Sequence, residues 1–422
     1  MKRYAKVSLL TILGLILVIQ SGCKKDGVIP PIPKEEKPEI IHPVSKLESH
    51  SEINKTTSWY NTNKSFTELF NVRKTQFFGF EITSEGIIPF IHGTYSLSKE
   101  PYYYWSAGGM YLYTDLTGDG KKDLYSNYLK APWPTNAKGL NLFCEYEKNP
   151  SSYDLQLGLS GVRKCVLTDV NNDKFNEVVI FSHGYDSPPF PGDSISIFYP
   201  RTLQYKYLSE EVGFFHGGAC GDINNDGWAD IAAYSGGSAV IPVHPVAYIN
   251  KGNGLFALSN SVFKGFTNTD NFYTLELFDI NNDGKLDLFL TNMIILQENG
   301  VFDRSKAISL PIDDNLLIVD IAFFDINEDN KLDILTMSVI ENYMGYKLDI
   351  FINNSTSFSK STEQYIDYNY GSGQNNWITW IRLFDYDKDG DVDIVGDGLC
   401  GDLLDKVIYW NNKEGKFVKT VK

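Results

Sequence analysis

The chain is poor in basic residues, cysteine and histidine, and each shortage excludes a class of function. Its 422 residues include 38 Lys and Arg against 53 Asp and Glu, which gives a formal net charge of −15. Nucleic-acid binding needs a basic face that neutralises phosphates, so we expect no nucleic-acid partner. The five cysteines form no C-x-x-C pair, and H-E-x-x-H, G-x-S-x-G and phosphate-cradling glycine loops are all missing. The sequence therefore contains no common catalytic motif.

Long apolar runs are also scarce, and the clearest one stands at the amino end. Residues Val7 to Ile19 are apolar and follow a basic start, which is typical of a secretory signal and too short for a membrane span. Ser21 and Gly22 precede Cys23, and small residues before a Cys resemble a bacterial lipoprotein signal, although Gln20 departs from the usual aliphatic residue. We predict that residues 1–22 are a lipoprotein signal peptide. A plain signal peptide with an incidental Cys is the alternative.

The predicted lipoprotein would be held at a membrane by a lipid on Cys23. Residues 23–46 are rich in proline and charge, so they cannot bury enough apolar surface to fold and would act as an extended tether. Lys24-Lys25-Asp26 resembles the charged tag that sends some bacterial lipoproteins to the surface. The expected location is the cell envelope, at the outer membrane or the cell surface.

The most informative stretch is Leu277 to Phe289, which reads LFDINNDGKLDLF. Oxygen donors recur at alternate positions along nine residues, and the seventh contributes its backbone carbonyl. Gly284 stands where the chain must turn sharply, a position that glycine tolerates because it has no Cβ. Carboxylates at this density repel one another unless a cation lies among them, and hard oxygen ligands suit Ca²⁺. The flanks are apolar and resemble strands, so the stretch predicts a calcium loop in a β-hairpin.

The same pattern occurs six times, and the first aspartates of successive copies are 46 to 60 residues apart. A period near 50 indicates a repeat architecture. We predict up to six structural Ca²⁺ ions, with the third, fourth and sixth copies as the firmest sites. The candidate ligands, in chain order, are Asp115, Thr117, Asp119, Lys121 and Asp123; Asp169, Asn171, Asp173, Phe175 and Glu177; Asp222, Asn224, Asp226, Trp228 and Asp230; Asp279, Asn281, Asp283, Lys285 and Asp287; Asp325, Asn327, Asp329, Lys331 and Asp333; Asp385, Asp387, Asp389, Asp391 and Asp393.

The copies are unequal, and their spacing separates them from two other calcium motifs. Thr117 is a weaker ligand than Asn or Asp, while Lys174 and Asn330 replace the glycine of the other copies. An EF-hand loop has twelve residues, closes with Glu and lies between helices. Here the loop closes at its ninth residue and continues into β-type sequence. A dockerin would show two copies with helical flanks.

The pattern D-x-[DN]-x-D-G-x-x-D between strands resembles the FG-GAP/VCBS repeat family, known from integrin α-subunit β-propellers. The resemblance covers about Trp105 to Lys422 and implies an all-β fold, a β-propeller of four-stranded blades. In the third unit we expect strands over Ile231–Tyr234 and His244–Asn250, with a fourth from Leu255. The sixth unit predicts strands over Ile381–Phe384, Asp393–Val395, Lys406–Trp410 and Gly415–Val418.

The number of blades depends on residues that precede the first acidic loop. The stretch from about Leu47 to Pro101 is one repeat long and has strand-like runs at Gln76–Thr83 and Ile87–Tyr95. We predict a degenerate blade there, so that residues 47–422 form a seven-bladed propeller. Six blades with an N-terminal extension is the alternative.

Four cysteines follow Cys23, at positions 144, 165, 220 and 400. In an exported protein they would allow two disulfides, whose connectivity sequence does not reveal. Cys165 and Cys220 each lie in a predicted strand just before an acidic loop, where a buried thiol is an equal alternative.

The resemblance also implies where a ligand would dock. In the family, ligands bind the face opposite the calcium loops, where rigid aromatics can anchor a sugar ring or a protein. The candidate ligand face comprises Trp105, Trp133, His183, Tyr185, His216 and Trp377. We predict no catalytic residues.

Three functions fit this arrangement. The first is a non-catalytic, surface-anchored scaffold that presents a glycan- or protein-binding face. The second is a polysaccharide lyase or hydrolase on the same fold, and the third is a docking disc within an envelope assembly. Fold alone does not choose between them.

Overall fold

The structure is a computed structural model, and it describes separate stretches between residues 75 and 421. The described residues are 75–77, 80–83, 86–89, 94–97, 100–103, 111–121, 123–130, 139–145, 149–155, 157, 159, 161–184, 192–208, 212–235, 245–267, 273–312, 316–324, 326–327, 329, 331–340, 344–355, 357–361, 365–367, 380–384, 393–397, 407–411 and 417–421. The predicted signal peptide, Cys23 and the tether lie outside them.

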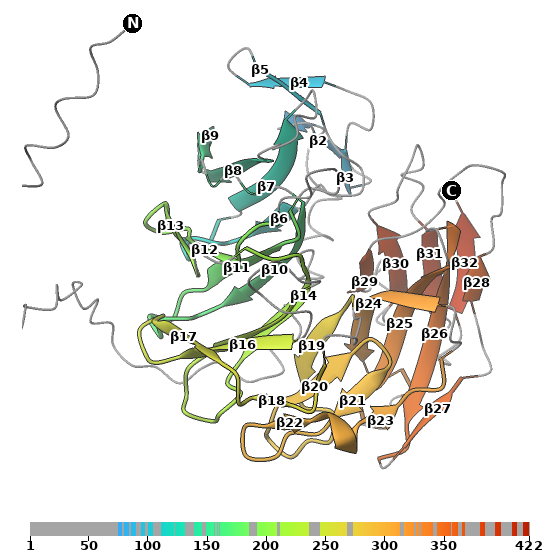
Figure 1. Ribbon diagram of the computed structural model, residues 1–422. Coiled ribbons are helices and arrows are strands. Elements are labelled where there is room, and N and C mark those ends of the chain that lie inside the picture. Colours follow the sequence, from blue (N-terminus) through green and yellow to red (C-terminus); the bar gives the residue numbers. More distant parts are fainter. Residues whose placement is uncertain are drawn as a thin grey trace, which may run out of the picture. The chain divides into compact units, whose positions relative to one another are not determined.

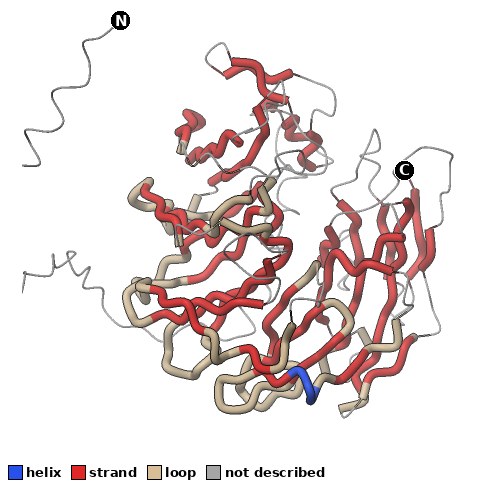
Figure 2. Tube along the Cα trace, viewed as in Figure 1, coloured by secondary structure: helices blue, strands red, loops and turns tan. Residues whose placement is uncertain are grey.

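The described part of the chain is built from β-strands (Figures 1 and 2). Its one helical element is a short 3-10 turn, η1 (Arg304–Lys306). Within these residues no helix has the length and apolar character to cross a membrane. The all-β prediction is therefore confirmed.

Most strands form antiparallel sheets in which neighbours along the chain are neighbours in the sheet. We name each sheet a blade and number it by the acidic loop between its first two strands. The second blade is β10 (Val162–Thr168), β11 (Glu177–Ser182), β12 (Ser196–Tyr199) and β13 (Gln204–Tyr207). The third is β14 (Phe215–Gly221), β15 (Asp230–Ser235), β16 (Pro245–Asn250) and β17 (Phe256–Ser259). The fourth is β19 (Leu275–Phe278), β20 (Asp287–Leu290), β21 (Met293–Ile295) and β23 (Ile308–Ser309).

The last two blades keep this order. The fifth is β24 (Leu316–Phe324), β25 (Asp333–Ile340), β26 (Met344–Asn353) and β27 (Phe358–Lys360), with β28 (Tyr365–Asp367) also paired to β26. The sixth is β29 (Trp380–Phe384), β30 (Asp393–Asp397), β31 (Val407–Asn411) and β32 (Phe417–Val421). The strands predicted in the third and sixth units are all present, with ends that differ by a few residues. A short parallel pair joins β18 (Phe263–Lys264), which precedes the fourth blade in sequence, to β22 (Phe302–Asp303), which lies between β21 and β23.

The sheet of the first acidic loop has additional strands. It contains β6 (Tyr111–Thr114), β7 (Asp123–Lys130), β8 (Gly139–Glu145) and β9 (Asn149–Asp154), and it also includes β4 (Thr94–Leu97) and β5 (Glu100–Tyr103) because β5 pairs with β7. The preceding β1 (Thr75–Phe77), β2 (Phe80–Thr83) and β3 (Gly86–Pro89) form a three-stranded sheet. Each strand-like run expected before residue 101 thus contributes to two strands, Gln76–Thr83 to β1 and β2 and Ile87–Tyr95 to β3 and β4. Among the described residues the predicted degenerate blade is not a single four-stranded sheet.

The hydrophobic core lies between successive blades. One cluster joins the second and third blades through residues such as Val166, Phe181 and Ile231. A second joins the third and fourth through Ala219 and Leu277, among others, and a third joins the fourth and fifth. A central strand is covered on both faces by neighbouring blades, so all six residues of β11 and of β15 are buried. This explains their continuous apolar runs, which alternation alone would not predict.

The first strands of successive blades lie next to one another. β14 is in contact with both β10 and β19, and β24 is in contact with β29. First strands that neighbour one another, with the later strands of each sheet farther out, are the arrangement of propeller blades.

Cys165 and Cys220 are buried free thiols. Burial raises the pKa of both thiols, so neither is activated. The buried-thiol alternative is confirmed for this pair.

Candidate functional site

Hydrogen bonds give the first four acidic loops nearly the same conformation. In the third loop the first carboxylate, Asp222, accepts the N–H groups of Asp226 (2.9 Å) and Gly227 (2.7 Å). The fifth-position carboxylate accepts the N–H of the seventh residue, at 3.0 Å for Asp226 and Trp228. The same bonds recur in the first, second and fourth loops. Regular spacing in the sequence therefore corresponds to one repeated structure.

The sixth loop position requires a left-handed backbone. Gly120, Gly227 and Gly284 have φ of 83°, 89° and 81° there, and Lys174 has φ of 75°. Glycine reaches this region without a Cβ penalty, whereas another L-residue is strained. The prediction that Gly284 occupies a sharp turn is confirmed. In the second loop Lys174 stands at this position, so the backbone of that loop is strained.

Replacing Lys174 with Gly is therefore expected to stabilise the second blade. The gain should be about 0.5–1 kcal/mol, because the relief of left-handed strain exceeds the added entropy of the unfolded chain. Urea denaturation measures it. Lys174→Ala is the matched control, since it removes the same exposed side chain but keeps the strain; equal midpoints for the two variants would contradict the explanation.

The ninth carboxylate of each described loop is buried. Asp230 accepts N–H groups from Ile223 (3.0 Å) and from Asn250 (2.8 Å). Desolvation by burial raises the pKa of Asp230 to about 7 and that of Asp287 to about 7. The same cause raises the pKa of Asp123 to about 6 and that of Glu177 to about 8. Burial thus disfavours the charged form of these carboxylates, and a nearby cation would favour it.

The donor chemistry of these loops fits Ca²⁺, since their side chains supply hard oxygens. In each described loop the ninth carboxylate is also desolvated. The carboxylates are nevertheless engaged with loop N–H groups, and among the described residues no three Asp, Glu, His or Cys side chains gather closely enough to hold one ion. Asp325, Asp385, Asp387, Asp389 and Asp391 lie outside the described residues. Calcium coordination remains a prediction.

A side-chain amide after the third, fourth and fifth acidic loops joins one blade to the previous one. Asn250 donates to the carbonyl of Val170 in the second loop at 2.8 Å. Gln297 donates to Ile223 in the third loop at 2.7 Å, and Asn353 donates to the carbonyl of Ile280 in the fourth loop at 3.3 Å. Each of these residues also donates its backbone N–H to the ninth carboxylate of its own blade. At each of three blade interfaces, one of these residues thereby links the acidic loops of two consecutive blades.

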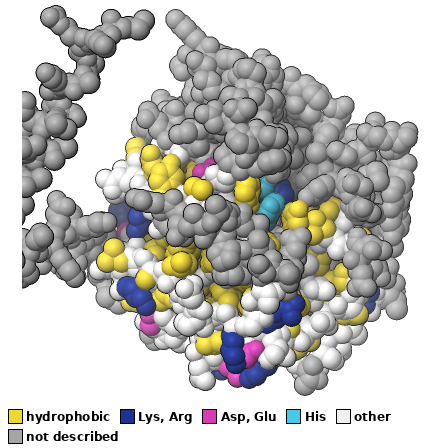
Figure 3. Space-filling model, viewed as in Figure 1, with side chains coloured by type: hydrophobic (Ala, Val, Ile, Leu, Met, Phe, Trp, Pro, Cys, Tyr) yellow, Lys and Arg dark blue, Asp and Glu magenta, His cyan; other side chains and the backbone are white. Residues whose placement is uncertain are grey.

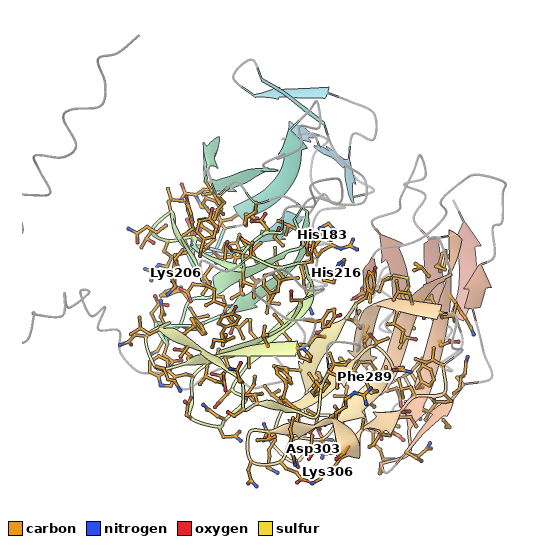
Figure 4. The ribbon with its side chains drawn as sticks, in the orientation of Figure 1. His183, Lys206, His216, Phe289, Asp303 and Lys306 are labelled. Carbon is orange, nitrogen blue, oxygen red and sulfur yellow. The ribbon has the colours of Figure 1, made fainter. Side chains whose placement is uncertain are left out.

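His183 and His216, two residues of the predicted ligand face, lie together (Figure 4). Their ring centroids are 4.9 Å apart at an interplanar angle of 86°. His216 also contacts Tyr273, with centroids 4.6 Å apart. His183 is 2 % exposed, and its Nδ1 lies 2.7 Å from the Gly184 carbonyl oxygen, so Nδ1 carries the proton. The three rings form a continuous row, which we call the ring row.

The ring row lies at the end of the blades opposite the acidic loops. β11 starts at the last residue of the second loop, and His183 follows its far end. His216 lies near the start of β14, and Tyr273 precedes β19, while the third and fourth loops follow these strands. Tyr273 was not among the predicted site residues, because its alignment with His216 appears only once the strand register is known. Trp105, Trp133, Tyr185 and Trp377 lie outside the described residues.

A buried ion pair spans from the second blade to the fourth. Lys164 on β10 pairs with Glu276 on β19, and its ammonium also lies 3.4 Å from the Leu275 carbonyl. The two side chains are 10 % and 4 % exposed. Gly217 on the intervening β14 has no room for a side chain, since an added Cβ would lie 2.6 Å from the Leu275 nitrogen. The pair therefore links first strands that are not consecutive.

Comparison with known proteins supports one repeat family. The model of the FG-GAP-like repeat matches residues 222–290, and no curated protein matches the chain. Among solved structures, the crystal structure of Porphyromonas gingivalis dipeptidyl peptidase 4 is 13 % identical with a TM-score of 0.25. The match covers 75 % of this chain and 38 % of that one, and at this TM-score it carries no argument. The predicted FG-GAP-type repeat is thus confirmed for residues 222–290, which contain the third and fourth acidic loops.

Proposed function

We propose that this protein is a non-catalytic, calcium-stabilised propeller, anchored at the cell envelope, whose face opposite the acidic loops binds a glycan or a protein. The observation that carries the proposal is the ring row, in which His183, His216 and Tyr273 come from three consecutive blades. Rigid rings held by separate sheets provide a preformed contact surface with little ordering cost. In this proposal the blades close into a ring.

Calcium would be bound by the six loops and would be structural. The ligands would be the side chains at loop positions one, three, five and nine, with the seventh carbonyl. A bound cation would neutralise the carboxylates and favour the charged form of buried groups such as Asp230 and Asp287. Extracellular calcium modules have Kd values of roughly 10⁻⁴–10⁻³ M, which suits a permanent external supply. Anchoring through Cys23 and the tether would keep the propeller in that environment.

An enzyme on the same fold is the second candidate, and one observation favours it. A lyase needs a base such as His or Tyr near the axis, and the rings of His216 and Tyr273 are in contact, with an interplanar angle of 54°. No carboxylate pair among the candidates suggests a hydrolase. Rings in contact are equally suited to binding, so the scaffold remains the preferred function.

The experiment that separates these functions pairs a glycan array with a polysaccharide-depolymerisation screen, each run with and without Ca²⁺. The scaffold predicts calcium-dependent retention of a glycan, or of a protein partner in a parallel binding assay, without chain cleavage. New unsaturated or reducing ends would establish the enzyme and overturn the non-catalytic function. Absence of both binding and cleavage across these assays would contradict both candidates.

A further inference from the structure

The first strands of the second, third and fifth blades each have one residue that the neighbouring strand does not pair. On β10 the pairing with β11 skips Arg163, between Val162 and Lys164. On β14 the pairing with β15 skips His216. Tyr273 and His216 occupy equivalent positions in their blades. The sequence distance from Tyr273 to Phe278, the end of β19, equals that from His216 to Gly221, the end of β14. Such β-bulges re-aim a side chain and are common next to functional sites.

Arg163 lies on β10, His216 lies on β14 and Tyr273 lies just before β19, and His183 connects these positions. β14 lies beside both β10 and β19. The N–H of His183 donates to the Gly161 carbonyl at 3.0 Å, two residues before Arg163. Gly161 allows this approach, because an added Cβ would lie 2.6 Å from His183 Nδ1. The ring row therefore begins beside the strand that carries Arg163, and Figure 3 shows histidine exposed on this face.

Charge distinguishes Arg163 from its neighbour Lys164. The Lys164 ammonium is buried against Glu276 and is neutralised there. Arg163 is half-buried, and its guanidinium has no ion pair or hydrogen bond with another described residue. The chain has a net charge of −15, but the described acidic loops lie at the opposite end of the blades. Screening over about 8 Å at physiological salt separates the two ends electrostatically.

We propose that Arg163 and the ring row bind an oxyanion, a carboxylate or sulfate group, on an acidic polysaccharide. This inference deepens the proposed function and rests on it. A guanidinium binds carboxylate or sulfate through two parallel hydrogen bonds. His183 donates its Nδ1 proton to the Gly184 carbonyl and so orients the row. His216 and Tyr273 supply ring faces and edges for the sugar that carries the anion.

The test uses the full chain with calcium and compares matched oligosaccharides by isothermal titration calorimetry. One pair is oligogalacturonide with free carboxylates and the same oligomer fully methyl-esterified, which removes charge and keeps the sugar chain. A second pair is chondroitin sulfate and its desulfated form, which identifies sulfate as the anion. Desulfated chondroitin keeps its uronate carboxylates, so this pair differs in sulfate alone. We expect the more highly charged member of at least one pair to bind about tenfold or more tightly than its partner, the effect of one charge-assisted hydrogen bond.

Variants locate the site. Arg163→Gln should weaken binding of the anionic oligomer about tenfold, while Lys264→Gln, which removes one positive charge from an exposed ion pair with Asp303, should leave it unchanged. His216→Gln should weaken both the charged and the neutral oligomers, and calcium-loaded melting curves check that each variant folds. Equal affinity for both members of each pair, or an unchanged Arg163→Gln, would overturn the inference. Tight binding of neutral glycans alone would do so while leaving the proposed scaffold function intact.

Discussion

Removal of calcium should lower the melting temperature of the protein by about 10 °C. If three loops are occupied with Kd values of roughly 10⁻⁴–10⁻³ M, about 10 mM Ca²⁺ adds about 1.4–2.7 kcal/mol per site. Three sites then give about 4–8 kcal/mol, and a domain of this size shifts by about 2 °C for each kcal/mol. Differential scanning calorimetry of calcium-loaded protein, with and without excess EDTA, measures the shift.

A single-loop variant tests whether the effect comes from the acidic loops. Asp283→Ala removes the candidate ligand at the fifth position of the fourth loop, together with its bonds to the Lys285 backbone and ammonium. In calcium its melting temperature should fall below that of the unaltered protein, and in EDTA most of that difference should disappear. Glu298→Gln, at an exposed pair with Lys306, is the control for loss of one negative charge. An EDTA-independent melt of protein shown to contain calcium would contradict the structural role.

The loss of one ion should also affect the neighbouring blade. Asp230 accepts a hydrogen bond from the backbone N–H of Asn250. The side-chain amide of Asn250 in turn donates to the Val170 carbonyl of the second loop. The interface between the third and fourth blades is linked in the same way through Asp287 and Gln297. A loosened loop therefore disturbs hydrogen bonds on both sides of a blade interface. We expect one cooperative transition, with amide exchange in EDTA increasing at Asn250 and Gln297 together.

The repeat could be predicted from the sequence because its signals are local. A loop such as Asp279–Asp287 contains its own ligands, its turn residue and the start of the next strand. Buried central strands such as β15 contain continuous apolar runs. These features need no knowledge of the partner strand, which explains why the strands of the third and sixth units were placed within a few residues.

The ring row and the ion pair could not be predicted in the same way, because both depend on register between blades. Tyr273 lies 57 positions after His216 in the sequence, as the numbering shows, and only the contact between β14 and β19, which belong to different sheets, brings the two residues together. Lys164 and Glu276 are separated by 112 residues. The sheet to which the amino-terminal strands belong depends on register for the same reason, since β5 pairs with β7 as well as with β4.

Lys164→Met should lower the free energy of unfolding by about 3–5 kcal/mol. The substitution keeps the length and apolar stem of the side chain but removes the cation from Glu276, and breaking one side of a buried ion pair leaves an uncompensated charge. The bond to the Leu275 carbonyl is also lost. Urea denaturation in calcium measures the change. An unchanged slope of the unfolding free energy against urea concentration shows that the variant exposes the same amount of surface when it unfolds.

A double variant distinguishes loss of the ion pair from loss of packing. In Lys164→Met with Glu276→Leu both charges are absent, and much of the lost stability should return, because an apolar replacement of a buried pair is often neutral. Lys206→Met is the single-site control, as Lys206 is a half-buried lysine that lies over the rings of Tyr199 and Phe256 and donates to the Gly254 carbonyl. If Lys164→Met costs no more than this control, the ion pair between the second and fourth blades contributes nothing to holding their first strands together. If the double variant is as unstable as Lys164→Met, the destabilisation comes from packing around Gly217, which an apolar pair cannot restore.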